Sequence, residues 1–267
     1  MNDEARLLKD MERAKQICLL DDEFMTRFFE DNIPVTEFVL KIILNLDLKV
    51  KSVETQKTIK NLRGRSVRLD ICAETSDGKI CNIEIQRQDK GAGAKRARYY
   101  AGILDSNALL PGDDFEKLPE TYIIFITEKD VLKKNKPIYF IERTIKETGE
   151  NFNDGLHIVY VNNSIKDDTP LGKLMHDFAC PDVNKMNYKI ISERARGFKE
   201  FVKGVAPVSK IFEEIREEGR EEERKNFAVR LLEKGKMTIA EIAELCKLTP
   251  AEVNLLAEQK NNSGKSF

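Results

Sequence analysis

The residues best suited to chemistry lie in a predicted β-hairpin, residues 66–88, SVRLDICAETSDGKICNIEIQRQ. Segments of alternating apolar and polar residues flank its turn, and Gly78 supplies the left-handed position that a three-residue hairpin loop needs. With the turn centred on Asp77, Asp70 lies directly opposite Glu84. Opposed Cβ atoms are about 4.5–5.5 Å apart, a distance at which two carboxylates repel each other. A hard divalent cation bound by both would offset this repulsion, so the pattern indicates a metal site.

Strand alternation divides the side chains of this hairpin between two faces. The polar face carries the acidic pair, with Arg68 opposite Gln86 and Cys72 opposite Asn82. An alternative interpretation is a solvated strand face whose acids pair with Arg68 or Arg87, because acids are common on wet sheets. The apolar face is expected to face the core and consists of Val67, Leu69, Ile71, Ala73, Cys81, Ile83 and Ile85.

The local charge favours a site that cleaves phosphodiester bonds. Residues 60–98 contain ten Lys or Arg and five Asp or Glu, whereas the 267-residue chain has 45 bases, 46 acids and a formal net charge of −1. This near-neutral total excludes a globally basic nucleic-acid coat but not a local basic patch. In such a site the bases bind the phosphate backbone and the acids hold the metal.

The remaining elements place the hairpin in an α/β domain with a mixed sheet (α+β in its segregation of elements). Two helices come first and are separated at Asn32-Ile33-Pro34, because the residue before proline is disfavoured in the α region. One strand-rich core flanked by helices is typical of this class. From periodicity we predict helices at residues 22–29, 35–46 and 93–110 and from 170 onward, and strands near residues 49–60, 66–75, 79–87, 122–126, 138–141 and 156–161.

Several motifs, in this order, resemble those of the PD-(D/E)XK nuclease superfamily. More closely, over about residues 15–235, the chain resembles the bacterial PD-(D/E)XK nuclease family transposases, a group that includes recombination-promoting nucleases. The motifs are Asp21-Asp22-Glu23-Phe24-Met25, Gly64-Arg65-Ser66-Val67-Arg68-Leu69-Asp70, Asn82-Ile83-Glu84-Ile85-Gln86-Arg87, Lys95-Arg96-Ala97-Arg98-Tyr99-Tyr100, Pro111-Gly112-Asp113-Asp114-Phe115, Leu118-Pro119-Glu120-Thr121-Tyr122 and Pro170-Leu171-Gly172.

The resemblance implies a restriction-endonuclease-like core of α-β-β-β-α-β order, with added helices and a helical C-terminal extension. It implies a Mg²⁺-dependent endonuclease, with Mn²⁺ as a substitute, that hydrolyses DNA phosphodiester bonds in transposition or recombination of mobile DNA. Asp70 and Glu84 match the metal ligands, and Gln86 takes the third catalytic position. The alternative is a catalytically silent nuclease fold that binds DNA or a partner.

Gln86 departs from the commoner pattern of the superfamily, which has lysine at this position. Lysine contributes a positive charge that steadies the transition state, whereas glutamine can orient a water but cannot act as a general base. Arg68 and Arg98 are the candidates for the missing charge and for contacts with DNA phosphates. The superfamily often adds an acid from its first helix, for which Glu23 and Glu37 are both candidates.

The C-terminal part is expected to be helical and separate. A nuclease-like domain at residues 1–205 is followed by a charged helical linker at 206–235, a helix-turn-helix-like unit at 236–260 and a flexible tail at 261–267. The helix pair carries Glu241, Glu244 and Glu252 against Lys247 alone, which disfavours reading of DNA bases. We therefore favour a docking or oligomerisation pair over a helix-turn-helix that reads DNA sequence. A homo-oligomer through these helices is one such arrangement.

Other residue types exclude several classes of protein. The five cysteines include no C-x-x-C pair, which argues against a disulfide framework and favours a reducing cytoplasm. Residues 1–13 are charged, so no secretory signal is expected, and no apolar run approaches the ~18 residues of a membrane span. His157 and His176 are expected to be structural rather than catalytic.

Overall fold

A six-stranded mixed sheet forms the centre of Glu12–Phe201, the larger of two units into which the chain divides; the other combines Met1–Met11 with Val202–Phe267. The computed structural model describes residues 16–61, 64–87, 91–204, 224–225, 227–232 and 237–263, without the side chains of Glu23 and of residues 200–204 and 258–263.

The sheet has the strand order β1-β2-β3-β4-β6-β5. β1, β2 and β3 pair antiparallel, β3, β4 and β6 pair parallel, and β5 lies at the far edge antiparallel to β6. This mixed sheet confirms the predicted fold class. The strands are β1 (Val50–Ile59), β2 (Val67–Thr75), β3 (Ile80–Gln86), β4 (Thr121–Thr127), β5 (Ile138–Ile141) and β6 (Leu156–Asn162).

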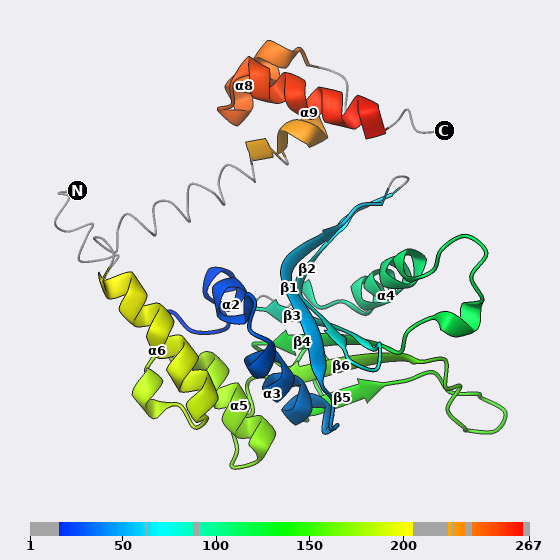
Figure 1. Ribbon diagram of the computed structural model, residues 1–267, viewed down its shortest axis with the longest axis vertical. Coiled ribbons are helices and arrows are strands. Elements are labelled where there is room, and N and C mark those ends of the chain that lie inside the picture. The colour runs from blue at the N-terminus through cyan, green and yellow to red at the C-terminus, as the bar shows by residue number, and fades with distance from the viewer. Residues whose placement is uncertain are drawn as a thin grey trace. The chain divides into compact units, whose positions relative to one another are not determined.

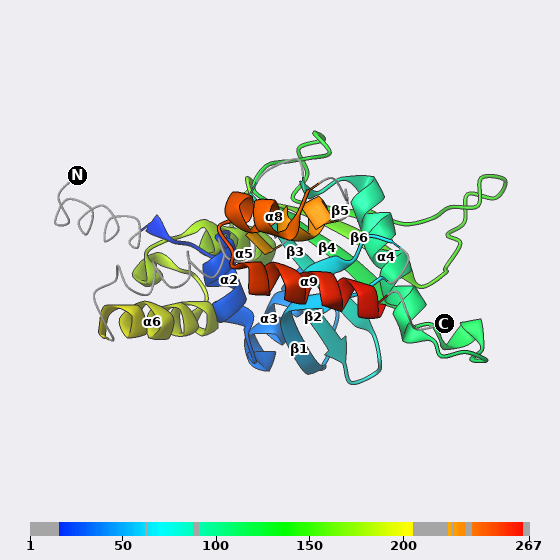
Figure 2. The ribbon, with the colours of Figure 1, turned by 90° about the horizontal axis from the view of Figure 1, so that it is seen from above.

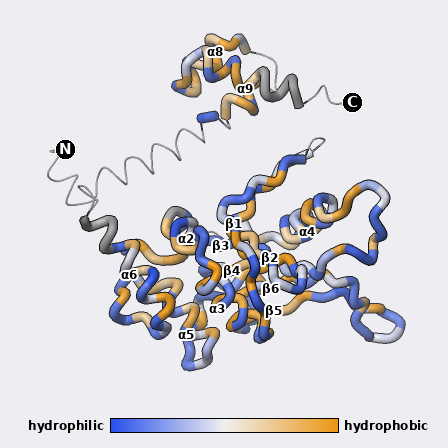
Figure 3. The backbone as a smooth tube through the Cα atoms, in the orientation of Figure 1, coloured by the Kyte–Doolittle hydropathy of each residue, from blue (hydrophilic) through white to orange (hydrophobic). Residues whose placement is uncertain are grey.

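Helices cover both faces of the sheet (Figures 1 and 2). One face packs against α2 (Asp22–Phe29), α3 (Ile33–Leu44), α5 (Pro170–Ala179) and α6 (Lys189–Gly204), and the other against α4 (Ala94–Ala108). Every residue of β4 is buried because both of its faces are covered. Figure 3 shows how apolar residues recur along the strands.

The break predicted at Asn32-Ile33-Pro34 is the start of α3. The Asn32 side chain accepts a hydrogen bond from the Val35 N–H group at 3.3 Å, and Pro34 lies in the first turn, where its missing N–H group is not needed. The helix therefore begins at Ile33, two residues before the predicted start.

The predicted hairpin register is confirmed where β2 and β3 pair. Cys72 lies opposite Asn82, and the ladder runs from Ile71–Ile83 to Glu74–Ile80. Gly78 has a φ of 87°, as the turn requires. The expected opposition of Arg68 and Gln86 is wrong, because β2 leaves β3 before that point and Arg68 pairs with Thr58 of β1.

The predicted single apolar face of the hairpin is also corrected. Ile71 belongs to the cluster under α2, α3, α5 and α6, but Val67 and Leu69 belong to the cluster under α4. The change of cluster occurs beside Gln56, which lies between the β1 partners of Ile71 and Leu69 and has a φ of 53°. β2 keeps its alternation through this point and its register with β1 does not shift there, so side chains on one face of the hairpin contact the helices on both sides of the sheet.

The described part of the second unit is a small helical cluster. Residues 227–232, α8 (Ile239–Cys246) and α9 (Pro250–Ser263) enclose Ala228, Ile242 and Val253. Thr238 and Glu241 form a reciprocal capping box at the start of α8. Most of the predicted linker, residues 206–235, lies outside the described residues, and the predicted domain boundaries remain predictions.

Both histidines have structural partners. His157, in β6, contacts Glu120 at 3.0 Å and Glu142 at 2.9 Å, and His176, in α5, contacts Asp177 at 3.1 Å. All five cysteines are free thiols. In the part of the chain that the structure describes, no helix has the length and hydropathy of a membrane span.

Candidate active site

Asp70 and Glu84 lie where β2 and β3 separate. Beyond Ile71 and Ile83 the two backbones no longer pair; β2 stays beside β1 while β3 stays beside β4. The Asp70 N–H group donates to Glu84 Oε1 at 3.2 Å, and the Ile85 N–H group donates to Asp70 Oδ2 at 3.0 Å. Each carboxylate therefore accepts a backbone donor that strand separation would otherwise leave unpaired.

Glu84 is fully buried and is held from both sides. Its Oε1 atom also accepts from Asn82 Nδ2 at 3.2 Å, and its Oε2 atom accepts from Arg96 Nη2 of α4 at 2.8 Å. A buried carboxylate needs such partners, because transfer of an unpaired charge out of water is strongly unfavourable.

Arg96 is the cation of this site. In addition to Glu84, its Nη1 atom donates to Gln86 Oε1 at 3.4 Å and to the Gly91 carbonyl at 2.9 Å, and its Nε atom donates to the Tyr100 hydroxyl at 2.8 Å. The guanidinium also lies 4.9 Å from the centroid of the Tyr100 ring. These contacts fix the orientation of the positive charge beside Glu84 and Gln86.

The two arginines that the sequence favoured occupy other places. Arg68 donates through Nε to Gln56, whose amide nitrogen donates to Thr26 of α2 at 2.8 Å, so Arg68 lies toward α2. Its charge still lowers the pKa of Asp70. Arg98 is exposed on α4 and, among the described residues, makes no hydrogen bond or ion pair with either carboxylate.

Sequence reasoning did not single out Arg96, the arginine that pairs with Glu84, although Arg96 lies in one of the quoted motifs. The helical period offered a signal. Ala97, Tyr100 and Leu104 form the buried face of α4, and Arg96 lies one turn before Tyr100, whereas Arg98 is exposed.

Of the two acids proposed from the first helices, the structure describes only the side chain of Glu37, and it lies away from the acidic pair. Glu37, in α3, accepts from the Val50 N–H group at 3.0 Å and pairs with Lys49 at 3.1 Å at the start of β1. The Glu23 side chain lies outside the described side chains. Asp22, at the start of α2, is an acid that the sequence analysis overlooked; its charge raises the pKa of Asp70.

Both acids of the pair hold their protons more tightly than ordinary carboxyl groups. Burial raises the pKa of Glu84 to about 8, and repulsion by Asp70 adds to this effect more than Arg96 opposes it. Burial likewise raises the pKa of Asp70 to about 6, although the hydrogen bond from Ile85 lowers it. Shifts of this kind, with a specific charged partner, are typical of functional sites.

The residues at this point fit a hard divalent cation. Asp70 and Glu84 offer carboxylate oxygens, and the buried Asn82 Oδ1 atom beside them has no hydrogen-bond partner in the described part of the chain. No group of three or more His, Cys, Asp or Glu among the described residues forms a complete protein ligand set. Mg²⁺ is suited to such a site, because it is commonly bound by one or two carboxylates and keeps several waters.

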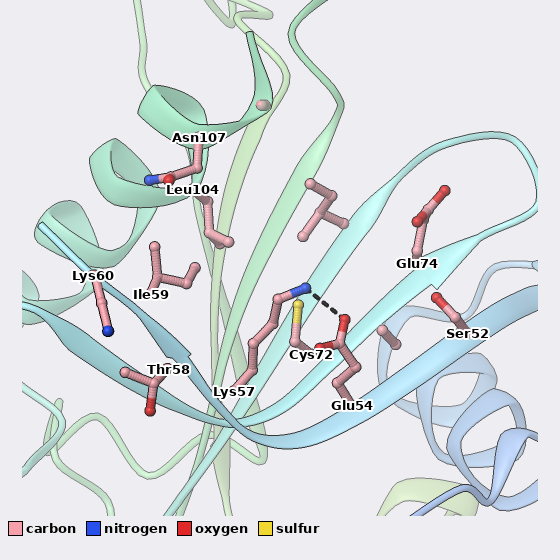
Figure 4. A pocket seen from close by; sticks show the side chains of 13 residues that line it. Ser52, Glu54, Lys57, Thr58, Ile59, Lys60, Cys72, Glu74, Leu104 and Asn107 are labelled. Carbon is pink, nitrogen blue, oxygen red and sulfur yellow. Dashed lines mark hydrogen bonds and ion pairs between the residues drawn. The ribbon is translucent and has the colours of Figure 1, made fainter. Parts of the chain in front are cut away.

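A cavity of about 440 Å³ lies elsewhere on the same unit (Figure 4). Residues of β1 and β2 and the C-terminal part of α4 line it, and a 2.6 Å ion pair joins Glu54 to Lys57 within it. Burial raises the pKa of the neighbouring Cys72 thiol to about 11, so the thiol is not an activated nucleophile. None of Asp70, Glu84, Gln86 and Arg96 lines this cavity, so it is separate from the acidic pair.

The fold and the site together define the class of PD-(D/E)XK nuclease folds: a mixed sheet with helices on both faces, and an acidic pair where two strands of a hairpin separate. Residues 15–167 match the sequence model of the PD-(D/E)XK nuclease family transposases, and the chain belongs to this family. Searches of curated proteins and of solved structures give no match.

The raised pKa values predict a characteristic pH dependence of stability in the absence of metal. A carboxyl group whose folded-state pKa is raised stabilises the fold fully below its ordinary value, near 4.5 for Glu84, and this contribution is lost as pH rises through the folded-state pKa. Between pH 5 and 8 in EDTA, we expect the free energy of unfolding to fall by on the order of 2 kcal/mol. Urea titrations measure it.

Glu84→Gln should flatten that pH dependence, because the amide stays neutral over this range. Its one oxygen can still accept from Asp70 and Asn82, or from Arg96, whereas its nitrogen only donates. Glu116→Gln, at an exposed residue of the 3-10 turn Phe115–Lys117, is the matched control and should retain the wild-type slope. If the free energy of unfolding changed equally with pH in all three proteins, the raised pKa would not belong to Asp70 and Glu84.

Proposed function

We propose that this protein is a metal-dependent DNA endonuclease that hydrolyses phosphodiester bonds during transposition or recombination of mobile DNA. Membership of a nuclease family supports this proposal, and one observation carries it: the buried Glu84 and the half-buried Asp70 each accept a backbone N–H group of the other's strand where β2 and β3 separate. A protein that only binds DNA has no need of such a pair, because the repulsion between the two acids at Glu84 exceeds what the ion pair with Arg96 compensates.

Asp70 and Glu84 are the residues that would hold Mg²⁺, or Mn²⁺ in its place. When bound, the cation supplies Lewis-acid stabilisation of charge at the scissile phosphate. The pair exchanges its retained proton for the cation, since a ligating carboxylate must be deprotonated.

Gln86 and Arg96 act together beside this pair. Because Gln86 Oε1 already accepts from Arg96, its Nε2 hydrogens are the groups left to orient a water or a phosphate oxygen. Arg96 supplies the positive charge that lysine provides in the commoner superfamily pattern. Its contacts with Tyr100, Gly91, Gln86 and Glu84 hold it in place and leave one Nη2 hydrogen for a phosphate oxygen.

DNA is the substrate, and exposed basic side chains around the site contact its phosphate backbone. Arg98, on the exposed side of α4, suits this role, and Arg68 lies on the α2 side of Asp70. Contacts of this kind position the duplex and carry no base specificity.

The second unit is proposed to dock a partner helix or a second copy of the chain. Phe227, Leu245 and Leu255 are 44%, 57% and 56% exposed there. Its acids Glu241 and Glu252 are used in the caps of α8 and α9. Exposed apolar side chains and acidic helix caps favour binding to another protein over recognition of DNA bases.

Cleavage of supercoiled plasmid tests the nuclease. We expect nicking or linearisation with Mg²⁺, none with EDTA, and a loss of at least about 100-fold in rate for Asp70→Asn and for Glu84→Gln, because each removes a metal ligand. Binding of a labelled duplex is measured in parallel. If several forms of DNA are not cut and both variants bind DNA as the wild type does, the protein is instead the catalytically silent DNA-binding fold.

Substitutions of Arg96 and of Arg98 should have different effects, the first on the rate of cleavage and the second on DNA binding. Arg96→Ala removes a charge placed at the reacting centre and should lower the single-turnover cleavage rate by about 100-fold. Arg98→Ala removes an exposed charge and should mainly weaken binding, with a shallower dependence on salt. The same loss of rate in both variants, at saturating enzyme, would contradict the role given to Arg96.

Substitution of Gly91 tests whether the position of the Gln86 amide matters, while Gln86 itself is kept. A Cβ atom at Gly91 would lie 1.6 Å from Gln86 Oε1, so Gly91→Ala must displace that amide from Arg96. We expect cleavage to fall as far as in Gln86→Ala, with little change in melting temperature. Gly93→Ala is the matched control, because its Cβ would meet nothing within 4 Å. Wild-type cleavage by Gly91→Ala would show that the position of Gln86 is unimportant.

A further inference from the structure

A lysine-rich loop, residues 128–137, starts beside the site at the carboxyl end of β4. Thr127 pairs with Gln86 in the sheet, and the next N–H group, that of Glu128, donates to the Gln86 carbonyl at 3.1 Å. The loop then crosses the end of β6 to reach β5, with the Asn162 N–H group donating to the Pro137 carbonyl at 2.9 Å. Its sequence, EKDVLKKNKP, contains four lysines.

Two side chains fix the backbone of this loop. The Asp130 carboxylate accepts from the N–H groups of Leu132 at 3.1 Å, Lys133 at 3.0 Å and Asn135 at 2.6 Å. The Tyr139 hydroxyl accepts from the N–H groups of Lys134 at 3.2 Å and Lys136 at 3.1 Å, and it donates to Asp130 at 2.7 Å. Every backbone N–H group from residue 132 to residue 136 is thus bonded to one of these two side chains.

The core anchors this frame. Val131 and the Tyr139 ring pack against the cluster under α4, and Asn162 Nδ2 donates to the Lys136 carbonyl at 3.2 Å. Lys133 and Asn135 have φ values of 55° and 53°, a left-handed conformation that such residues rarely adopt without support. The frame therefore holds the loop in one shape before any ligand arrives.

The lysines of this loop are exposed and, within the described residues, have no acidic partner. Lys129, Lys133, Lys134 and Lys136 make none of the ion pairs there, whereas lysines elsewhere on the unit do, such as Lys41 with Glu37 at 3.2 Å and Lys117 with Asp113 at 2.7 Å. The loop's own Asp130 is turned inward to its backbone. The ammonium groups thus present an uncompensated positive charge on a rigid support.

We propose that Lys133, Lys134 and Lys136 bind the phosphate backbone of the DNA duplex whose strand is cleaved at Asp70 and Glu84. The inference rests on the proposed function and adds a second binding surface to it. Strand order places this loop on the β4 side of the acidic pair, whereas the exposed Lys60 and Arg65 lie on the β1–β2 side. A duplex that crosses the carboxyl ends of β3 and β4 contacts positive charge on both sides of the cleavage point. A loop whose backbone is already fixed loses little backbone freedom on binding, which favours affinity.

Salt titration of duplex binding tests the loop. The variant K133Q/K134Q/K136Q is compared with the wild type and with K146Q/K185Q/K189Q, which removes the same charge from exposed positions elsewhere on the unit. Binding of a labelled 20-base-pair duplex is measured in EDTA, where no cleavage occurs. Each phosphate contact contributes about 0.9 to the slope of log K against log salt, so the loop variant should lose about 2 to 3 in slope and roughly 10- to 100-fold in affinity at low salt.

The rigid frame is tested with the lysines kept. Tyr139→Phe removes the acceptor of two N–H groups without any change of charge, and we expect several-fold weaker binding with the fold intact by circular dichroism. Wild-type affinity in Tyr139→Phe would overturn the pre-organised frame. Equal affinity and slope in the loop variant and in the control would overturn the phosphate contact itself.

Failure of the loop proposal is distinguishable from failure of the proposed function. A wild-type protein that neither binds duplex DNA nor cuts plasmid with Mg²⁺ overturns both. A wild-type protein that binds and cuts, beside a loop variant indistinguishable from the control, overturns the loop alone.

Discussion

The separation of β2 from β3 at Asp70 and Glu84 is the constraint on which the site depends. Where two strands part, their facing N–H groups lose their partners, and the two carboxylates accept those groups. The same bonds hold two acids together in a buried place, where burial and mutual repulsion favour their neutral forms. A cation at this point would relieve the repulsion, so the break in the ladder and the proposed metal site have one physical origin.

The hairpin was the most predictable part of the structure. A turn with glycine at its left-handed position and clean alternation were enough to place Cys72 opposite Asn82, and with them the acidic pair. The prediction of one shared core for the apolar face failed, although β2 alternates throughout. Gln56 takes a left-handed conformation on the neighbouring strand, and Leu69 packs against α4 rather than with Ile71. Local sequence does not reveal the positive φ of Gln56, because that conformation is stabilised by contacts with distant residues, here Thr26 of α2 and Arg68.

Contacts between distant elements explain the other differences. Glu37 was a reasonable candidate for a third acid, yet its carboxylate binds the Val50 N–H group at the start of β1. Arg96 reaches the acidic pair only because α4 packs its Tyr100 face on the sheet, and the direction of that packing depends on residues as remote as Phe125. Spacing identifies which residue types can do the chemistry, whereas the choice among neighbouring arginines requires the docking of the helix.

The glutamine in place of lysine follows from the same docking. Gln86 Oε1 lies 3.4 Å from Arg96 Nη1, so a lysine at position 86 would bring its ammonium group close to a guanidinium that already serves Glu84. Two cations at that distance repel, and one of them would have to leave the site. A neutral amide instead accepts a hydrogen bond from Arg96 and keeps its own donors for a water or a phosphate oxygen. In the proposed site the positive charge therefore lies on the helix and not on the strand, and Gln86 is a strand residue compatible with that position.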